Sequence, residues 1–176
     1  MSETKKIYKV IINAPIETVW ATLVKTDDLL PFFFGAVCRT PLDLEVGAPF
    51  AMQTPNGKYA SVVGSVLEFT PPYRYSHSFK FTTFDDPPCT VTYELKEVPE
   101  GTEFSLITTN VPPGTKTEQQ MKQGGNFIVN VLKSVVETGR PSMGYRLLLG
   151  VISMAAPFTP KKCKTKNWSF EKISKL

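Results

Sequence analysis

The sequence predicts an α+β fold in which a curved antiparallel sheet of about seven strands holds one long helix near the C-terminus. Three observations predict it. Residues 37–111 contain alternating apolar runs without a helical period, short Pro- and Gly-rich turns separate these runs, and residues 115–139 keep one apolar helical face. Strands joined by such short turns pair antiparallel, because a parallel pair needs a crossover of about a dozen residues. The last helix is the only predicted element long enough to cover the sheet.

The first elements are a strand and two short helices. Residues 6–13 alternate between a strongly apolar face and a mixed one, which predicts a strand. Pro15 ends that strand and suits the first position of a helix, and apolar residues at helical spacing in 16–23 predict a short amphipathic helix. A second start signal opens 26–34 and Gly35 follows it, so we expect a second short helix there.

The long helix carries signals at both ends. Thr115 and Glu118 form a capping-box pattern, and Gly139 stands where a C-terminal cap belongs. Inside the helix, Gly124 and Gly125 each cost about 1 kcal/mol relative to Ala. The pair therefore predicts a kink or a close approach of the helix backbone to another element.

Length and charge divide the chain into one domain and an extension. The 176 residues, 41% of them hydrophobic, suffice for one domain with a sizeable core. Residues 1–139 hold 12 basic and 15 acidic side chains, whereas residues 140–176 hold eight basic side chains and only Glu171 as an acid. We expect residues 1–139 to form the domain and residues 140–176 to be a basic C-terminal extension packed on it.

The extension has two interpretations. An apolar run at 145–158 precedes a lysine-rich stretch at 161–166. In one interpretation, residues 145–156 form a helix that buries Leu148, Leu149 and Ile152 against the domain. In the other, residues 145–166 lie on an anionic membrane surface. A nucleic-acid partner is not expected, because aromatic residues are not interleaved with the basic ones.

An aromatic row marks the candidate site. Residues 73–81 alternate without exception, which places aromatic side chains and the only histidine on one face of a strand. Apolar side chains of the next two strands and of the long helix complete a concave wall. The row holds Tyr73, Tyr75, His77, Phe79 and Phe81, and the rest of the wall is Val91, Tyr93, Phe104, Leu106, Met121 and Ile128. Either this wall lines a ligand-sized cavity, or its side chains simply fill a core.

The sequence offers little support for an enzyme. His77 is a candidate general acid or base, with Tyr75 or Tyr93 to relay a proton, but a hydrogen-bonded core histidine is the interpretation we favour. No catalytic residue is assigned, and we expect binding rather than catalysis. The sequence lacks the GxxxxGK[ST], GxGxxG and GxSxG patterns of phosphate, dinucleotide and hydrolase sites.

Cofactors and disulfides are not expected either. One histidine and the scattered Cys38, Cys89 and Cys163 fit neither a zinc site nor a disulfide framework, so we expect reduced thiols, no metal and no cofactor. The sequence shows no secretory signal pattern and no membrane-spanning apolar run, which predicts a soluble, cytoplasmic protein.

Four segments together resemble a known superfamily. Residues 14–20 (APIETVW), 46–50 (VGAPF), 64–75 (GSVLEFTPPYRY) and 101–106 (GTEFSL) occur in the order typical of START-like proteins, also called SRPBCC proteins. Within that superfamily the chain resembles the branch named for heat-shock-protein ATPase activator homologues, over residues 5–139. The resemblance implies a helix-grip fold with an apolar cavity between the sheet and the last helix, and no shared catalytic residues.

Three functions remain open from the sequence. The leading hypothesis is a binding module that holds an apolar or amphipathic small molecule, such as a lipid, in the cavity. The branch name implies an alternative, a protein-interaction module that regulates a chaperone partner. A polyketide-cyclase-like enzyme is the third, and it requires His77, Tyr75 and Tyr93 to converge on one ligand.

Overall fold

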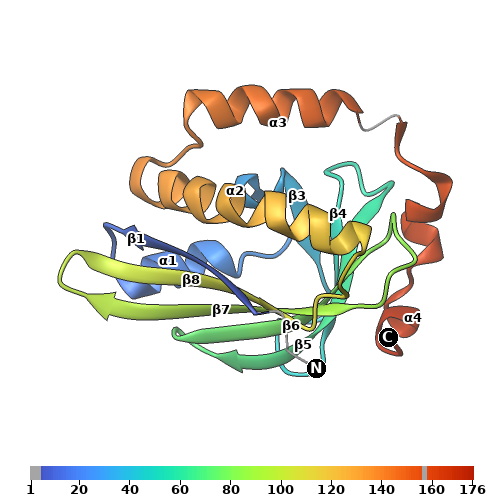
Figure 1. Ribbon diagram of the computed structural model, residues 1–176, viewed down its shortest axis with the longest axis horizontal. Helices are drawn as coiled ribbons and strands as arrows, with labels where there is room; N and C mark the ends of the chain where they lie inside the picture. The colour runs from blue at the N-terminus through green and yellow to red at the C-terminus, as the bar shows by residue number, and fades with distance from the viewer. Residues whose placement is uncertain (1–4, 156–157) are drawn as a thin grey trace.

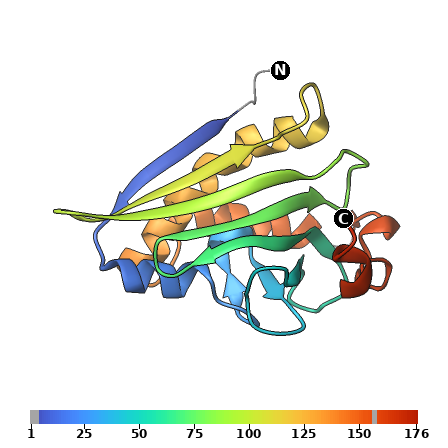
Figure 2. The ribbon, with the colours of Figure 1, turned by 90° about the horizontal axis from the view of Figure 1, so that it is seen from below.

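The computed structural model describes residues 5–155 and 158–176, and within them one eight-stranded sheet curves around a long helix (Figures 1 and 2). Its strand order is β1-β8-β7-β6-β5-β4-β3-β2, and every neighbouring pair is antiparallel. The strands are β1 (Lys6–Ile12), β2 (Leu29–Leu30), β3 (Ala36–Arg39), β4 (Pro49–Gln53), β5 (Ala60–Thr70), β6 (Arg74–Phe81), β7 (Cys89–Val98) and β8 (Gly101–Thr109). The predicted α+β architecture with a gripped helix is confirmed.

The helices occupy the concave side of the sheet and the C-terminal part of the chain. They are α1 (Ile16–Leu23), the 3-10 helix η1 (Pro31–Phe33), α2 (Lys116–Thr138), α3 (Met143–Ala155), the 3-10 helices η3 (Lys161–Cys163) and η4 (Thr165–Asn167), and α4 (Phe170–Ile173). The apolar positions that predict α1 all face the core, because Ile16, Val19, Trp20 and Leu23 are buried.

The second short helix is much shorter than predicted. Where residues 26–34 were expected to be helical, Leu29–Leu30 pair with β3 and only the 3-10 helix η1 follows. Pro31 explains the difference, since a proline forces the residue before it out of helical backbone angles, and Leu30 is extended. Phe34 then takes a left-handed conformation with φ of 57°, which ends η1 after one turn.

Helix α2 begins and ends as its sequence predicts. The Thr115 side chain accepts a hydrogen bond from the backbone N–H of Glu118 at 3.2 Å, and Gly139 ends the helix with φ of 75°. The Glu118 carboxylate in turn accepts from the backbone N–H of Gly114 at 2.9 Å, one residue earlier than in a standard capping box.

The two glycines inside α2 mark a close approach, one of the two alternatives that their sequence predicts. A β-carbon on Gly125 would lie 2.3 Å from the nearest ring atom of Tyr8, whereas one on Gly124 would lie 3.5 Å from the Phe34 ring. Tyr8 is held there, because its hydroxyl donates a hydrogen bond to the backbone carbonyl of Met121 at 3.3 Å. Gly125 therefore lets α2 rest directly on β1.

Alanine at these two adjacent positions should change stability in opposite directions. Gly125→Ala forces the Tyr8 ring to move, and the overpacking outweighs the gain in helix propensity by about 1–2 kcal/mol. Gly124→Ala meets only ordinary contact distances and should stabilise α2 by up to about 1 kcal/mol. Urea unfolding of both variants tests this, and a stabilised Gly125→Ala protein would show that β1 and α2 are not in contact there.

Helix α3 forms as predicted but does not bury the side chains expected. Leu148 and Ile152 are 43% and 36% exposed, so the expectation of burial is wrong for them, and Leu149 is only partly buried. Tyr145 packs edge-on against Phe127 of α2, with ring centroids 5.3 Å apart. The concave face of the sheet is already covered by α2, which leaves α3 only the outer side of α2 to rest on (Figure 1). Ala156 of the predicted segment lies outside the described residues.

The last part of the extension returns to the sheet. Lys164 forms a β-bridge with Tyr59, and Cys163 is fully buried. Ile173 of α4 lies in a second apolar cluster with Ala51, Ala60 and Val63, and Trp168 and Phe170 pack against it. The extension is thus held at its two ends, by Tyr145 near its start and by residues 163–173 near its end.

Candidate ligand-binding site

Strand register brings the predicted wall together. In the antiparallel pairing, Tyr75 lies opposite Tyr93, and Tyr93 lies opposite Leu106. His77 lies opposite Val91. Directly opposed residues point to the same face of a sheet, so three neighbouring strands present one continuous surface toward α2.

The predicted site residues lie in or against one core. Those on the sheet that are buried are Tyr75, His77, Phe79, Val91, Tyr93, Phe104 and Leu106. Those that are partly buried and pack at its edge are Phe81, Met121 and Ile128. Tyr73 does not belong to this set, because it precedes β6 in the turn after Thr70 and is 52% exposed.

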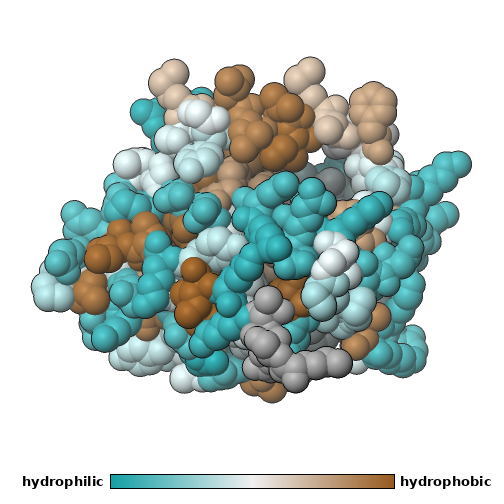
Figure 3. Space-filling view, viewed as in Figure 1, coloured by the Kyte–Doolittle hydropathy of each residue, from teal (hydrophilic) through white to brown (hydrophobic). Residues whose placement is uncertain are grey.

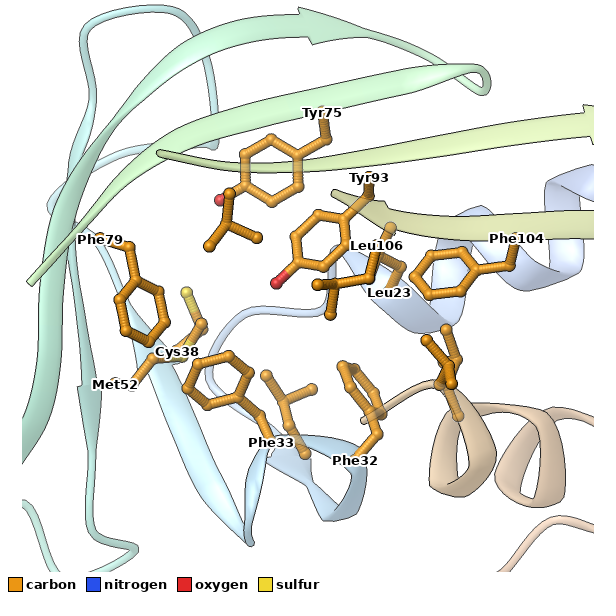
Figure 4. Packing of buried hydrophobic residues seen from close by; sticks show 14 of the residues in the cluster. Leu23, Phe32, Phe33, Cys38, Met52, Tyr75, Phe79, Tyr93, Phe104 and Leu106 are labelled. Atoms are coloured by element: carbon orange, nitrogen blue, oxygen red, sulfur yellow. The ribbon is translucent and has the colours of Figure 1, made fainter. Parts of the chain in front are cut away.

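Other residues that complete this interior were not predicted from the sequence. Cys38 of β3 and Met52 of β4 come from the far half of the sheet, and Phe32 and Phe33 come from η1 (Figure 4). They meet the aromatic row only because the sheet curls over. The three phenylalanines after Pro31 indicate a buried segment, but the sequence pattern placed them in the second short helix and not in the candidate site.

Two polar atoms in this interior have no partner. The hydroxyl of Tyr75 and Nε2 of His77 are buried and make no hydrogen bond with any residue that the structure describes. The other imidazole nitrogen, Nδ1, lies 2.9 Å from the backbone carbonyl of Ser78. A carbonyl only accepts, so Nδ1 carries the proton and Nε2 presents a free lone pair.

Burial keeps these groups uncharged. It lowers the pKa of His77 to about 4, although the hydrogen bond to Ser78 opposes this. It raises the pKa of Tyr75 and of Tyr93, and the negative charge of Cys38, when that thiol ionises, raises both further. It also raises the pKa of Cys38 to about 12. At neutral pH the site therefore offers phenol O–H donors and one imidazole acceptor, without a net charge.

The arrangement of these side chains suits ligand binding better than acid–base catalysis. His77 lies close to both tyrosines, with its ring centroid 5.1 Å from that of Tyr75 and 5.6 Å from that of Tyr93, so the three rings are neighbours. An imidazole with a pKa near 4 is a weak base at neutral pH. No carboxylate of the described residues hydrogen-bonds to it to strengthen it as a base.

The interior is closely packed. Phe33 lies against Phe79 with ring centroids 6.3 Å apart, and Tyr93 lies against Phe104 at 5.8 Å. A hollow of about 280 Å³ lies outside this interior, beside Tyr73 and Lys96, and one of about 10 Å³ lies beside Met121 and Thr108. A ligand-sized cavity between the sheet and α2 stays a prediction.

Known proteins share this fold. A family model described as activator of Hsp90 ATPase homolog 1-like protein matches residues 13–137. The structure of CalU16 from Micromonospora echinospora is similar at 20% identity with a TM-score of 0.60, over 87% of this chain and 86% of that one. The Aha1 dimer from Colwellia psychrerythraea is similar at 15% identity with a TM-score of 0.61, over 77% and 98%. DynU16, from the dynemicin biosynthetic locus, is similar at 22% identity with a TM-score of 0.64, over 80% and 50%. No curated protein sequence matches the chain.

Proposed function

Since this chain belongs to the family of activator of Hsp90 ATPase homolog 1-like proteins, within the START-like superfamily, we propose that it is a binding module for an apolar or amphipathic small molecule. The ligand enters between the curved sheet and α2. It contacts the aromatic wall with its apolar body and places one polar group at Tyr75 and His77.

The two unpartnered polar atoms carry this proposal. A buried donor or acceptor without a partner destabilises the folded protein by about 1–3 kcal/mol. The Tyr75 hydroxyl and His77 Nε2 therefore destabilise this interior more than apolar side chains in their place would. A ligand hydroxyl would satisfy both, because it accepts from the phenol and donates to the imidazole. Figure 4 shows the Tyr75 and Tyr93 hydroxyl groups directed into a region bordered by Cys38, Phe33 and Phe79.

Movement of the Phe33 side chain on η1 would make space for the ligand. Phe33 stands on a single 3-10 turn between Pro31 and the left-handed Phe34, so its ring is held by packing rather than by a long helix. Its neighbours Phe79 and Phe34 are at 6.3 Å and 6.5 Å between ring centroids. Displacing the Phe33 ring opens the interior next to Phe79 without breaking a strand pairing.

The lipophilic fluorophore Nile red tests whether the interior accepts a ligand. It should bind with one equivalent per chain, and Phe79→Trp should weaken it about tenfold or more by filling the space. Tyr73→Trp, on the exposed turn before the same strand, is the matched control and should bind normally. Leu147→Gln on the exposed helix α3 controls for dye adsorbed on the surface. Dye binding that survives Phe79→Trp but is lost in Leu147→Gln would contradict the interior site.

The polar group is tested with a pair of competitors. Decanol should displace Nile red more effectively than decane, because only the alcohol can bond to Tyr75 and His77. Tyr75→Phe should lower the affinity for decanol by about three- to tenfold, the value of one hydrogen bond, and leave decane unchanged. Equal losses for both competitors would mean that Tyr75 only shapes the wall.

A further inference from the structure

Helix α3 presents an apolar stripe to the outside. Met143, Leu147, Val151 and Met154 follow one another at spacings of four, four and three residues, which places them on one helix face. All four are between 58% and 85% exposed, and Figure 3 shows apolar side chains gathered along this edge of the molecule. Phe158, just beyond the helix, is 86% exposed.

Helix α3 is apolar both on the face toward α2 and on the face toward the outside, which is unusual for a helix on a protein surface. In α3 only Tyr145, Arg146 and Ser153 have polar groups in their side chains. A surface helix normally turns its polar residues outward, and a helix that is apolar all round is covered by protein or by lipid. The inner face of α3 rests on the core through Tyr145 and Leu149, and Tyr145 contacts Phe127 of α2. The outer stripe has no protein packed on it among the described residues, so it is an exposed apolar surface.

Basic side chains follow this stripe in the sequence. The Nζ atoms of Lys161, Lys164 and Lys166 form no ion pair or hydrogen bond with the residues that the structure describes, while the neighbouring Lys162 is paired with Asp85. Between residues 140 and 176 the sequence has eight basic side chains and one acidic one, Glu171. The cover of α3 must therefore combine an apolar layer with negative charge.

We propose that α3 docks on an anionic lipid surface and lies in its plane, with the outer stripe among the acyl chains and Lys161, Lys164 and Lys166 at the headgroups. Its 13 residues extend about 20 Å, which is shorter than the hydrocarbon core of a bilayer. Among the described residues there is no helix long and apolar enough to cross a membrane. The arrangement fits surface attachment.

Charge disfavours a second copy of the chain as the cover. Face-to-face packing of two α3 helices would bring together two extensions that each carry this excess of basic side chains, and like charges at an interface oppose association. Anionic headgroups supply the opposite charge. The backbone bridge between Lys164 and Tyr59 and the burial of Cys163 hold the lysine-rich segment against the domain, so its exposed charges keep a defined position.

Co-sedimentation with lipid vesicles tests the proposal on the full chain. Vesicles of phosphatidylcholine with about a quarter phosphatidylserine should bind the protein, and vesicles of phosphatidylcholine alone should bind it much less. Raising the salt should weaken the binding. Lys161→Gln with Lys166→Gln should lower the affinity by about tenfold or more, because each lysine near the surface contributes about a fivefold factor. Leu147→Gln with Val151→Gln should lower it at least as much.

Matched variants keep the test specific. Lys25→Gln with Lys96→Gln removes the same charge elsewhere, and Leu42→Gln changes an apolar side chain that is 71% exposed in a loop, so both proteins should bind vesicles normally. Melting curves of all variants should agree, since none of the changed side chains is buried. Binding that is indifferent to lipid charge would overturn the proposal. So would a dimer in sedimentation velocity that Leu147→Gln with Val151→Gln dissociates, if the wild type binds no vesicles.

Discussion

Replacing Ile173 with alanine is expected to lower the free energy of unfolding by about 2–4 kcal/mol, the usual loss for truncating a buried Ile. Ile173 is 1% exposed, although it lies three residues from the end of the sequence. It fills a gap between Ala51, Ala60 and Val63 on the side of β4 and β5 that α2 does not cover. Truncation at this position leaves a cavity lined by small side chains that cannot collapse into it.

Leu176→Ala is the matched control, because this residue is 50% exposed and its loss should cost less than about 0.5 kcal/mol. Both values come from urea unfolding followed by circular dichroism. If the two variants were equally stable, the last helix would not be docked on the sheet, and the position of the lysines at 161–166 would lose its support.

The two halves of the extension therefore have different roles. The segment from Cys163 to Ile173 contributes to folding, because it closes the uncovered side of β4 and β5. Helix α3 has no fully buried residue and packs against the core through Tyr145 and Leu149. A surface helix fixed in this way can be changed without unfolding the domain, which is why its outer stripe is open to clean mutational tests.

Local signals predicted the sheet and α2 correctly. Alternation in 6–12 and 75–81 followed the side chains that face the core, whereas Tyr73 lies in the turn before β6 and is exposed. The caps at Thr115 and Gly139 are set by neighbouring backbone groups. The glycine pair in α2 was informative for the same reason. A residue that weakens a helix needs a compensating contact, and Gly125 has one in Tyr8.

The predictions that were wrong concern segments whose apolar pattern does not show which other element they pack against. The apolar run in 26–34 fits a helix, but Pro31 excludes helical angles at Leu30 and turns the segment into a strand and a single 3-10 turn. The apolar content of α3 predicted burial, yet α2 had already covered the sheet. Cys38 joins the candidate site through the curl of the sheet, which no short stretch of sequence encodes.

The stability of the protein is expected to fall as the pH is lowered from 7 to 5, by about 2 kcal/mol in the free energy of unfolding. Burial lowers the pKa of His77 from 6.5 to about 4 in the folded state. The unfolded chain therefore takes up a proton near pH 6.5, whereas the folded chain does so only near pH 4, and stability is lost across that window. Below the folded pKa this contribution levels off, at a total of about 3 kcal/mol.

The window between pH 7 and 5 isolates one group, because His77 is the only histidine in the chain. The carboxylates of Glu118 and Glu137 have lowered pKa values, through hydrogen bonds from Lys122 and from the Asn13 backbone, so their contribution is lost only at lower pH. His77→Gln cannot take up the proton and should give a flat profile from pH 7 to 5, whatever its absolute stability. Equal slopes for wild type and variant, or an imidazole pKa near 6.5 by NMR, would show that His77 is solvated and would remove the buried acceptor from the proposed ligand site.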